Sequence, residues 1–174
     1  MEMLVSTQWL AEHLPDVVVL DASAHLPDAG RDAVAEFATA HIPGARHLDL
    51  ASLIDPASAV PAALPTAEHF AARLSALGVP TGARLVLSDD SYVKTAARAW
   101  FIARLHGAEA AILDGGLGKW RAEGRPLEAG AAAVAATAYT CAKGTGAVRS
   151  KAEVLANLAT HAEQLVDARG AKRF

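Results

Sequence analysis

Cysteine is almost absent from this chain, which has Cys141 as its one thiol in 174 residues. A single thiol cannot close an internal disulfide, and it cannot supply a zinc site built from several cysteines. The seven histidines include no HxxxH or HExxH spacing, so a histidine-based metal site is also disfavoured. The sequence therefore predicts a protein without a resident metal or other cofactor.

Long apolar runs and an excess of one charge are also missing. No stretch approaches the roughly 18 apolar residues of a membrane span, and the N-terminus lacks a basic-then-apolar leader. The 16 basic and 19 acidic side chains are interspersed and leave a net charge of −3, so no basic surface for nucleic acid is expected. These absences predict a cytoplasmic protein with neither a membrane nor a nucleic acid as partner.

What the chain does contain is an alternation of short apolar runs and amphipathic segments. Hydrophobic residues make up 52% of it, which is typical of a globular fold. Runs such as Val17–Leu20 and Ala111–Leu113 are apolar throughout, as expected of strands buried on both faces. Helical periodicity follows Ser6 or Thr7, either of which could be the N-cap, and again follows Thr66, a second N-cap position. The alternation predicts an α/β fold, a parallel sheet covered by helices on both faces.

Residues 84–107 are the central unit of this prediction. Leu85–Leu87 reads as a strand, Ser88–Tyr92 as a polar turn, and the segment from Lys94 as a helix that ends near Gly107. Helical spacing puts Ala97, Trp100 or Phe101, and Leu105 on its buried face. Ligands of such sheets bind at the carboxyl ends of the strands. Four aspartates follow predicted strands there: Asp21, Asp89, Asp90 and Asp114.

After residue 125 the composition changes to Ala, Gly, Thr and Pro with little periodicity, as in a linker or an extended wrap. The pattern of the N-terminus then returns: Ser150 precedes another amphipathic helix, and Leu165–Ala168 reads as another strand. Asp167 follows Asp21 by 146 residues, a distance that suits a duplicated domain. One helix and one strand cannot bury a core, so we expect a second domain cut short at Phe174.

Several motifs follow one another along the chain: Val5–Leu10, Gly30–Asp32, His41–Ala45, Leu113–Gly116 with Trp120, and Val166–Phe174. Together they resemble the tandem rhodaneses, the thiosulfate and 3-mercaptopyruvate sulfurtransferases. The resemblance implies a rhodanese-like three-layer fold, a five-stranded parallel sheet with helices on both faces. It also implies three parts, a non-catalytic first domain (1–128), a linker (129–147) and the truncated start of a second domain (148–174).

In this family a cysteine of the second domain takes a sulfane sulfur from thiosulfate or 3-mercaptopyruvate as a persulfide, and passes it to cyanide or a thiol. The resemblance places Asp90 of the first domain at the position of that cysteine, or Asp89 if the loop differs by one residue. A carboxylate carries no sulfur, so no catalytic residue is expected in this chain, which should be inactive alone. The implied partners are a small-molecule sulfur donor, a thiophilic acceptor and a second rhodanese domain.

The resemblance also concerns substrate binding. Arg169 and Arg173 match the anion-binding arginines of the second domain, and guanidinium groups suit a sulfonate or carboxylate; the alternative is that both are simply solvated. Ala51 and Ala62 stand where the mercaptopyruvate branch carries an acid and a histidine, which favours thiosulfate as the donor.

Other readings remain open for some residues. Cys141 lies outside any strand–loop–helix unit and is interpreted as a bystander thiol. Asp21 and Asp114 could serve acid–base chemistry but more commonly cap a turn or a helix, and His41 is expected to secure the turn before Pro43. A different hypothesis for the whole chain is a stand-alone, catalytically inactive rhodanese module used for protein binding or regulation. The half-formed repeat favours a two-domain enzyme.

Overall fold

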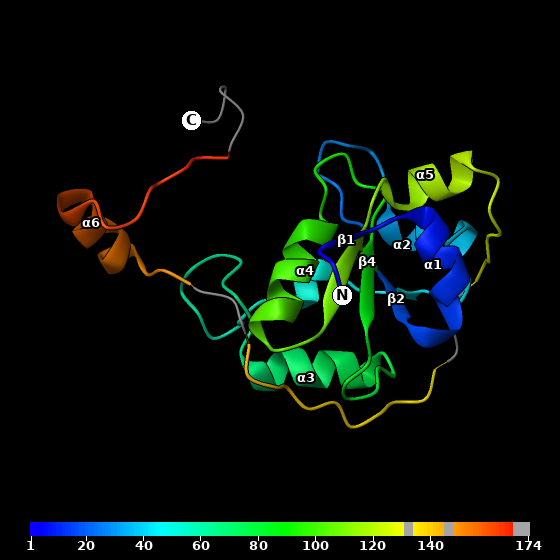
Figure 1. Ribbon diagram of the computed structural model, residues 1–174, viewed down its shortest axis with the longest axis horizontal. Coiled ribbons are helices and arrows are strands. Elements are labelled where there is room, and N and C mark those ends of the chain that lie inside the picture. Colours follow the sequence, from blue (N-terminus) through cyan, green and yellow to red (C-terminus); the bar gives the residue numbers. More distant parts are fainter. Residues whose placement is uncertain (131–133, 145–147, 169–174) are drawn as a thin grey trace.

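The computed structural model of the chain describes residues 1–130, 134–144 and 148–168. Within them, five parallel strands form one sheet in the order β1-β5-β4-β2-β3 (Figure 1). The sheet confirms the parallel α/β architecture predicted from the alternation of apolar runs and helices. The strands are β1 (Leu4–Val5), β2 (Val18–Asp21), β3 (Arg46–His47), β4 (Leu85–Ser88) and β5 (Ala110–Leu113).

Helices cover both faces of the sheet, which gives the three layers that the sequence led us to expect. On one face lie α1 (Thr7–His13), α2 (Ala33–Thr39) and α5 (Gly116–Ala122); on the other lie α3 (Ala67–Ala76) and α4 (Ala96–Leu105). Two 3-10 turns, Leu14–Asp16 and Leu50–Ser52, join these elements. The helix α6 (Lys151–Thr160) stands apart from the sheet in Figure 1.

Side-chain caps explain where several helices begin. The Ser6 hydroxyl accepts a hydrogen bond from the Trp9 N–H, and the Thr66 hydroxyl accepts one from the His69 N–H. Asp32 caps α2 in the same way, accepting from the N–H groups of Val34 and Ala35. Because these bonds join residues two or three positions apart, they form wherever the sequence places the capping residue. The predicted cap of α3 at Thr66 is therefore confirmed, and of the two candidates for α1 the structure selects Ser6.

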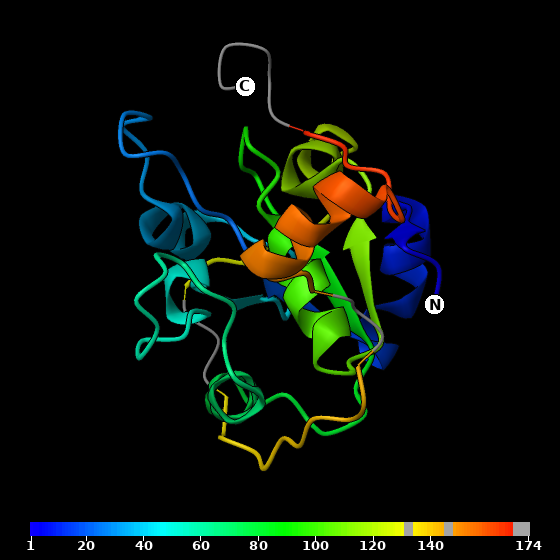
Figure 2. The ribbon, with the colours of Figure 1, turned by 90° about the vertical axis from the view of Figure 1, so that its left-hand side faces the viewer.

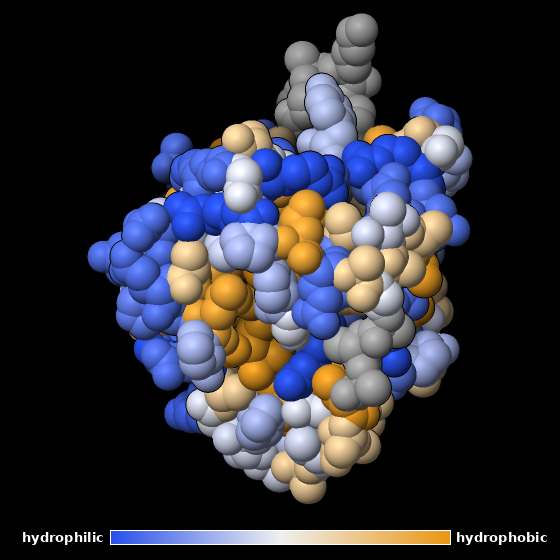
Figure 3. Space-filling model, turned by 90° about the vertical axis from the view of Figure 1, so that its right-hand side faces the viewer, coloured by the Kyte–Doolittle hydropathy of each residue, from blue (hydrophilic) through white to orange (hydrophobic). Residues whose placement is uncertain are grey.

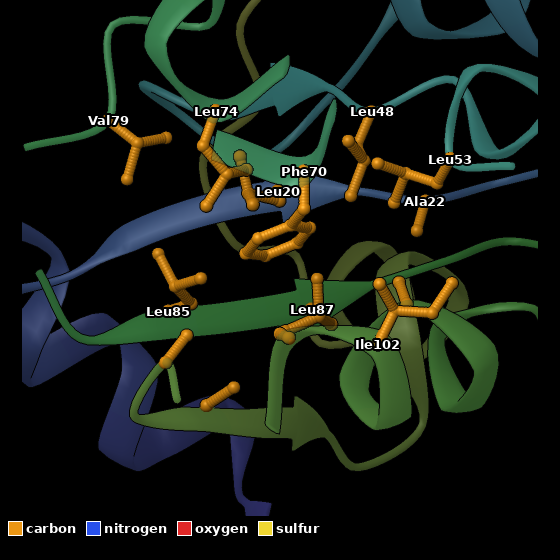
Figure 4. Packing of buried hydrophobic residues seen from close by; sticks show 14 of the residues in the cluster. Leu20, Ala22, Leu48, Leu53, Phe70, Leu74, Val79, Leu85, Leu87 and Ile102 are labelled. Atoms are coloured by element: carbon orange, nitrogen blue, oxygen red, sulfur yellow. The ribbon is translucent and has the colours of Figure 1, made fainter. Parts of the chain in front are cut away.

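Alternating strand residues build two cores, one on each face of the sheet. Leu20 and Leu87 point into the core under α3 and α4, where they meet Phe70 (Figure 4). Val19 and Val86 point into the core under α1, α2 and α5. The central strands β2 and β4 are thus buried on both sides, as their continuous apolar runs predicted. Figure 3 shows the side of the molecule with α1, α2 and α5, where apolar atoms gather in the middle and hydrophilic residues border them.

The buried face of α4 differs from the predicted one. Ala97 is exposed, while Trp100, Phe101 and Leu105 are only partly buried. The fully buried positions of this helix are Ala96, Ala99, Ile102 and Ala103. The prediction for Ala97 was wrong because the segment is apolar on nearly every side, so periodicity alone does not select the face. Small alanines lie against β4 and β5, which lets the helix approach the sheet closely.

The segment after α5 is an extended wrap around the domain (Figures 1 and 2). Glu128 forms an antiparallel bridge with His41 beside α2. Further along, the Thr137 N–H donates to the carbonyl of Ser75 in α3, and Tyr139 is buried in the core next to Phe70. Of the two sequence-based readings, linker or wrap, the described part of this segment follows the second.

The repeat near the C-terminus forms its helix and not its strand. Ser150 and Glu153 make a reciprocal capping box at the start of α6. Residues 161–168 contain no strand, although Leu165–Ala168 was predicted as one. A strand needs a neighbouring strand for its backbone hydrogen bonds, and this segment has none in the described residues. The apolar side of α6 is also uncovered: Leu155 and Leu158 are 57% and 54% exposed.

Candidate functional site

The loop between β4 and α4 lies at the carboxyl edge of the sheet, and Asp89 organises it from within. Its side chain is buried, and its Oδ2 accepts hydrogen bonds from the Ala96 N–H (2.8 Å) and the Thr95 hydroxyl (3.3 Å). The Asp89 carbonyl accepts the Leu117 N–H at 3.0 Å. Asp89 therefore supplies the cap that Thr95, the N-cap residue of α4, does not provide, and it ties the loop to α5.

Asp90, the next residue, faces outward into a pocket. Its N–H donates to the Ser23 hydroxyl at 2.9 Å, which fixes its backbone. Its Oδ2 lies 3.3 Å from a terminal nitrogen of Arg31 and 3.7 Å from one of Arg121. Arg31 also donates to the Asp90 carbonyl at 3.0 Å. Of the two aspartates considered from the sequence, Asp90 presents its carboxylate to the pocket and Asp89 does not.

Side chains, in addition to the loop's own N–H groups, hold this loop in place. The Thr95 hydroxyl donates to the Ala22 carbonyl (2.8 Å), and the Ser91 hydroxyl donates to the Ala24 carbonyl (2.6 Å). Together with the bond from Asp90 to Ser23, they attach the loop to the segment that follows β2. The loop geometry is thus set by contacts between two neighbouring strand ends, which restricts how Asp90 can move.

The pocket at this edge has a volume of about 450 Å³. It lies between the segment after β2, the helix α2, the β4–α4 loop and α5, and Phe37 and Leu117 contribute apolar surface to it. No cysteine and no histidine is among the described residues that line it. The pocket can hold a small polar molecule, but it presents no nucleophilic sulfur.

The charged groups of the pocket are connected in a network. Arg31 forms two hydrogen bonds with the Glu36 carboxylate, at 2.8 and 2.7 Å, and Glu36 also contacts His25 at 3.0 Å. The hydrogen bonds from Arg31 lower the pKa of Glu36. Arg31 thus bridges Glu36 and Asp90, while Arg121 approaches Asp90 from α5. The carboxylate of Asp90 pairs with the guanidinium groups of Arg31 and Arg121. Its negative charge therefore weakens the attraction that these two groups would otherwise have for an anion.

Asp21 also lines the pocket, at the end of β2. It is 4% exposed, and its Oδ1 accepts the Ser23 N–H at 2.9 Å, a local turn that confirms the capping interpretation. Burial raises the pKa of Asp21 above its ordinary value of 3.8, and the hydrogen bonds with Ser23 oppose that shift. The protonated form is therefore favoured more in the folded protein than in the unfolded chain.

We expect the Asp21→Asn variant to gain stability, relative to the original protein, as pH rises. A raised carboxyl pKa contributes stability that is complete below the unfolded value of 3.8 and is lost as pH rises through the folded value. Asparagine keeps the acceptor for the Ser23 N–H and does not ionise. The free energy of unfolding of the variant minus that of the original protein should increase from acidic to neutral pH, by about 1.4 kcal/mol for each unit of pKa difference.

Urea unfolding at several pH values measures this difference. Asp114→Asn is the control, because Asp114 is exposed and pairs with Lys119 at 3.2 Å. The expectation is contradicted if the free energy of unfolding of Asp21→Asn minus that of the original protein stays constant, or decreases, as pH rises.

Other residues singled out in the sequence lie elsewhere. Asp114 follows β5 but pairs with Lys119 and does not cap α5, whose N-cap Gly115 has no side-chain bond, so the capping interpretation was wrong here. His41 is buried against Phe37 and its Nδ1 contacts the Phe37 carbonyl at 2.8 Å, so it secures the end of α2. Arg169 and Arg173 lie outside the described residues.

Cys141 belongs to the wrap beside α3. Its Sγ lies 3.3 Å from the Ala67 carbonyl, and burial, the largest cause, raises the pKa of the thiol. A raised pKa lowers the fraction of reactive thiolate, and Cys141 does not line the pocket.

Within the described part of the chain, no group of three or more His, Cys, Asp or Glu side chains is placed to hold a metal ion. No helix there is long and apolar enough to cross a membrane.

Most partners of Asp90 leave no signal in the sequence. Arg31 stands out only as part of a motif, and no pattern singles out Ser23 or Arg121, or Glu36, which pairs with Arg31. Arg31 and Arg121 are separated by 90 positions in the chain, 121 minus 31, and both approach the same carboxylate. One arginine shortly before α2 and another in the last turn of α5 are a weak signal by themselves. Only the strand order brings them to one pocket.

The fold matches a known class of proteins. Residues 6–123 match the model of the rhodanese-like domain family, so the chain belongs to that family.

Individual relatives agree. The chain is 36% identical over 180 residues to 3-mercaptopyruvate sulfurtransferase of Homo sapiens, covering 98% of this chain and 61% of the relative. It is 42% identical over 133 residues to thiosulfate/3-mercaptopyruvate sulfurtransferase 1, mitochondrial, of Arabidopsis thaliana, covering 75% and 35%. The chain therefore spans less than two thirds of these relatives. The crystal structure of SseA from Escherichia coli, described as a 3-mercaptopyruvate sulfotransferase, superposes with a TM-score of 0.90 at 33% identity, covering 99% and 68%.

Proposed function

We propose that this chain is the first-domain part of a two-domain sulfurtransferase. The whole enzyme moves a sulfane sulfur from thiosulfate or 3-mercaptopyruvate to cyanide or a thiol through a cysteine persulfide in its second domain. The observation that carries this proposal is the pocket at the carboxyl edge of the sheet, where Asp90 faces the cavity and no described lining residue is a thiol. The sulfurtransferase names of the relatives support the reaction class.

The chemistry explains why the first domain cannot carry the sulfur itself. A thiolate attacks the outer sulfur of thiosulfate, the S–S bond of the donor breaks, and sulfite leaves with the bonding electron pair. The resulting persulfide then gives its outer sulfur to cyanide and regenerates the thiolate. The Asp90 carboxylate forms no stable persulfide, and its charge is held by Arg31 and Arg121. In this proposal Asp90 occupies the family's cysteine position and keeps the first domain inert.

A second domain is also supported by the exposed helix α6. In α1 the apolar side is covered, and Leu10 is 0% exposed. In α6, which follows a similar sequence pattern, Leu155 and Leu158 are more than half exposed. A further domain with its own sheet would cover these leucines as the first domain covers Leu10. The first domain then acts as a scaffold and as one wall of the interdomain active site.

We propose thiosulfate as the preferred donor. Ala51 is exposed in the 3-10 turn after β3, and Ala62 is exposed in the following loop, where its carbonyl accepts a hydrogen bond from Arg98. Neither alanine can transfer a proton. The chain therefore lacks the acid and the histidine that the resemblance places at these two positions in the mercaptopyruvate enzymes. The names of the relatives cover both donors, so both belong in the assay.

We expect this chain alone to transfer no sulfur above background from either donor to cyanide, because it presents no thiol in the pocket. The product of the full coding region should be active with a higher kcat/KM for thiosulfate than for 3-mercaptopyruvate. Thiocyanate formation measures both reactions. Cys141→Ser in the short chain is the matched control and should change nothing.

Robust turnover by the short chain that Cys141→Ser abolishes would overturn the proposal. A coding region without a thiol in a second pocket would leave the alternative, an inactive rhodanese module that binds other proteins.

A further inference from the structure

The 53–65 loop connects the 3-10 turn after β3 to α3, and it lies on the side of the domain where α6 stands (Figure 1). Arg98, in the first turn of α4, donates to the carbonyl of Ala62 in this loop at 2.8 Å. We propose that Arg98 is a positioning residue for the sulfur donor, because it holds Ala62 in the conformation that the donor meets. The inference rests on the proposed function, in which Ala62 belongs to the wall of the active site.

Two histidines hold the ends of the 53–65 loop. The Nε2 of His69, in α3, lies 2.8 Å from the Ser52 carbonyl just before the loop. The Nε2 of His106, after α4, lies 3.1 Å from the Pro65 carbonyl at its other end. Both ends are therefore fixed to the helices without Arg98, and a change at Arg98 acts on the middle of the loop.

The middle of the loop, residues 54–63, is joined to the domain through Arg98. Its other hydrogen bonds are internal, such as the one from the Asp55 N–H to the Ala63 carbonyl at 3.1 Å. In the described part of the chain, the bond from Arg98 is the one hydrogen bond between this segment and the rest of the domain. Its removal therefore frees the segment as a unit, while the internal bonds remain.

Ala62 needs this support because its backbone is strained. Its φ is +54°, in the left-handed region that residues with a side chain avoid. Such strain persists only where the surrounding structure enforces it, and it concentrates at functional sites. The charge-assisted hydrogen bond from Arg98 offsets the strain. Without that bond, Ala62 relaxes toward negative φ and the loop presents a different surface to the donor.

Arg98 is available for this role because neither core depends on it. Its side chain is exposed and belongs to neither of the two core clusters. None of the salt bridges among the described residues involves it. The segment from Pro56 to Ala67 contains no charged residue, so the wall that Arg98 holds does not repel an anionic donor such as thiosulfate.

Thiocyanate formation by the product of the full coding region tests the effect on the donor. Arg98→Gln should raise the KM for thiosulfate about tenfold, because one hydrogen bond is lost and KM rises as the fraction of protein with the loop in place falls. The kcat should change less than about twofold, since bound donor restores the loop. Adding Ala62→Gly to Arg98→Gln should bring KM back to within about threefold of the original, because glycine adopts positive φ without strain.

Hydrogen exchange of the 174-residue chain tests the loop without any sulfur donor. In Arg98→Gln the amides of Asp55 and Ala63 should exchange about tenfold faster, while the amides of α3 and α4 and the urea midpoint stay unchanged. Arg84→Gln is the matched control, because it removes the same charge and a bond to a backbone carbonyl, that of Asp16 at 3.5 Å, at the amino end of the sheet. It should alter neither KM nor exchange.

Unchanged exchange of the two loop amides in Arg98→Gln would overturn the inference. So would an unchanged KM for thiosulfate, or a raised KM that Ala62→Gly does not reverse. The two failures are distinguishable: a full-length product that forms no thiocyanate overturns the proposed function, whereas an active product that Arg98→Gln leaves unchanged overturns only the role of Arg98.

Discussion

Replacing Phe70 by alanine is expected to lower the free energy of unfolding by about 3–5 kcal/mol. Phe70 is 1% exposed and lies in the core between α3 and the sheet, beside Leu74 (Figure 4). Its ring stacks on His106 at 4.9 Å and meets the edge of Tyr139 at 6.0 Å. Alanine removes this apolar surface and leaves a cavity that the strands cannot close. It also removes the ring contact between Phe70 and Tyr139 of the wrap.

Urea unfolding followed by circular dichroism measures the loss. Tyr92→Ala is the control, because this aromatic side chain is 93% exposed, and its removal should change the free energy of unfolding by no more than about 0.5 kcal/mol. A loss below about 1 kcal/mol for Phe70→Ala, which is typical of an average substitution, would mean that this core is not packed as described.

Gly116→Ala is expected to cost about 3 kcal/mol or more of stability, from αL strain and a lost hydrogen bond with its desolvation. Gly116 has φ of +57°, and a Cβ at this position would lie 2.2 Å from the Asp89 carbonyl oxygen. That oxygen accepts the Leu117 N–H, so it cannot retreat without breaking the link between the β4–α4 loop and α5. The same shift would pull Asp90 away from Arg31 and Arg121.

Gly124→Ala is the control that separates backbone strain from the steric contact between residue 116 and the Asp89 carbonyl oxygen. Gly124 has φ of +68°, and a Cβ there meets nothing within 4 Å, so its substitution should cost only the backbone strain of about 1–2 kcal/mol. Urea unfolding of both variants gives the two losses. Equal losses for the two variants would show that the close approach of Asp89 to Gly116 does not constrain the site.

Local signals in the sequence predicted the elements that depend on local contacts. Ser6 and Thr66 cap their helices through bonds to residues three positions away. The run Val17–Leu20 predicts a buried strand because each of its side chains is apolar, whichever face it meets. In contrast, β1 has two residues, Leu4 and Val5, and exists only because β5 pairs with it. A two-residue strand leaves no periodicity to detect.

Predictions failed where a distant partner decides the outcome. Leu165–Ala168 carries a strand pattern, but without a neighbouring strand it stays irregular in the described structure. The buried face of α4 depends on how closely the helix approaches β4 and β5, so Ala97 could not be told from Ala96 by composition. Asp114 was expected to cap a turn or a helix, but the backbone turn at Gly115 leaves it pairing with Lys119.

The amino-acid sequence alone determined that aspartates would follow the buried strands and that the loop after β4 would contain no thiol, because both properties belong to the order of residues. Only the tertiary structure decided what each aspartate does. It buries Asp89 as a helix cap and turns Asp90 toward Arg31 and Arg121, two residues 90 positions apart in the chain. The physical reason is the parallel sheet, which brings the ends of separate strands to one edge and thereby sets which charges meet.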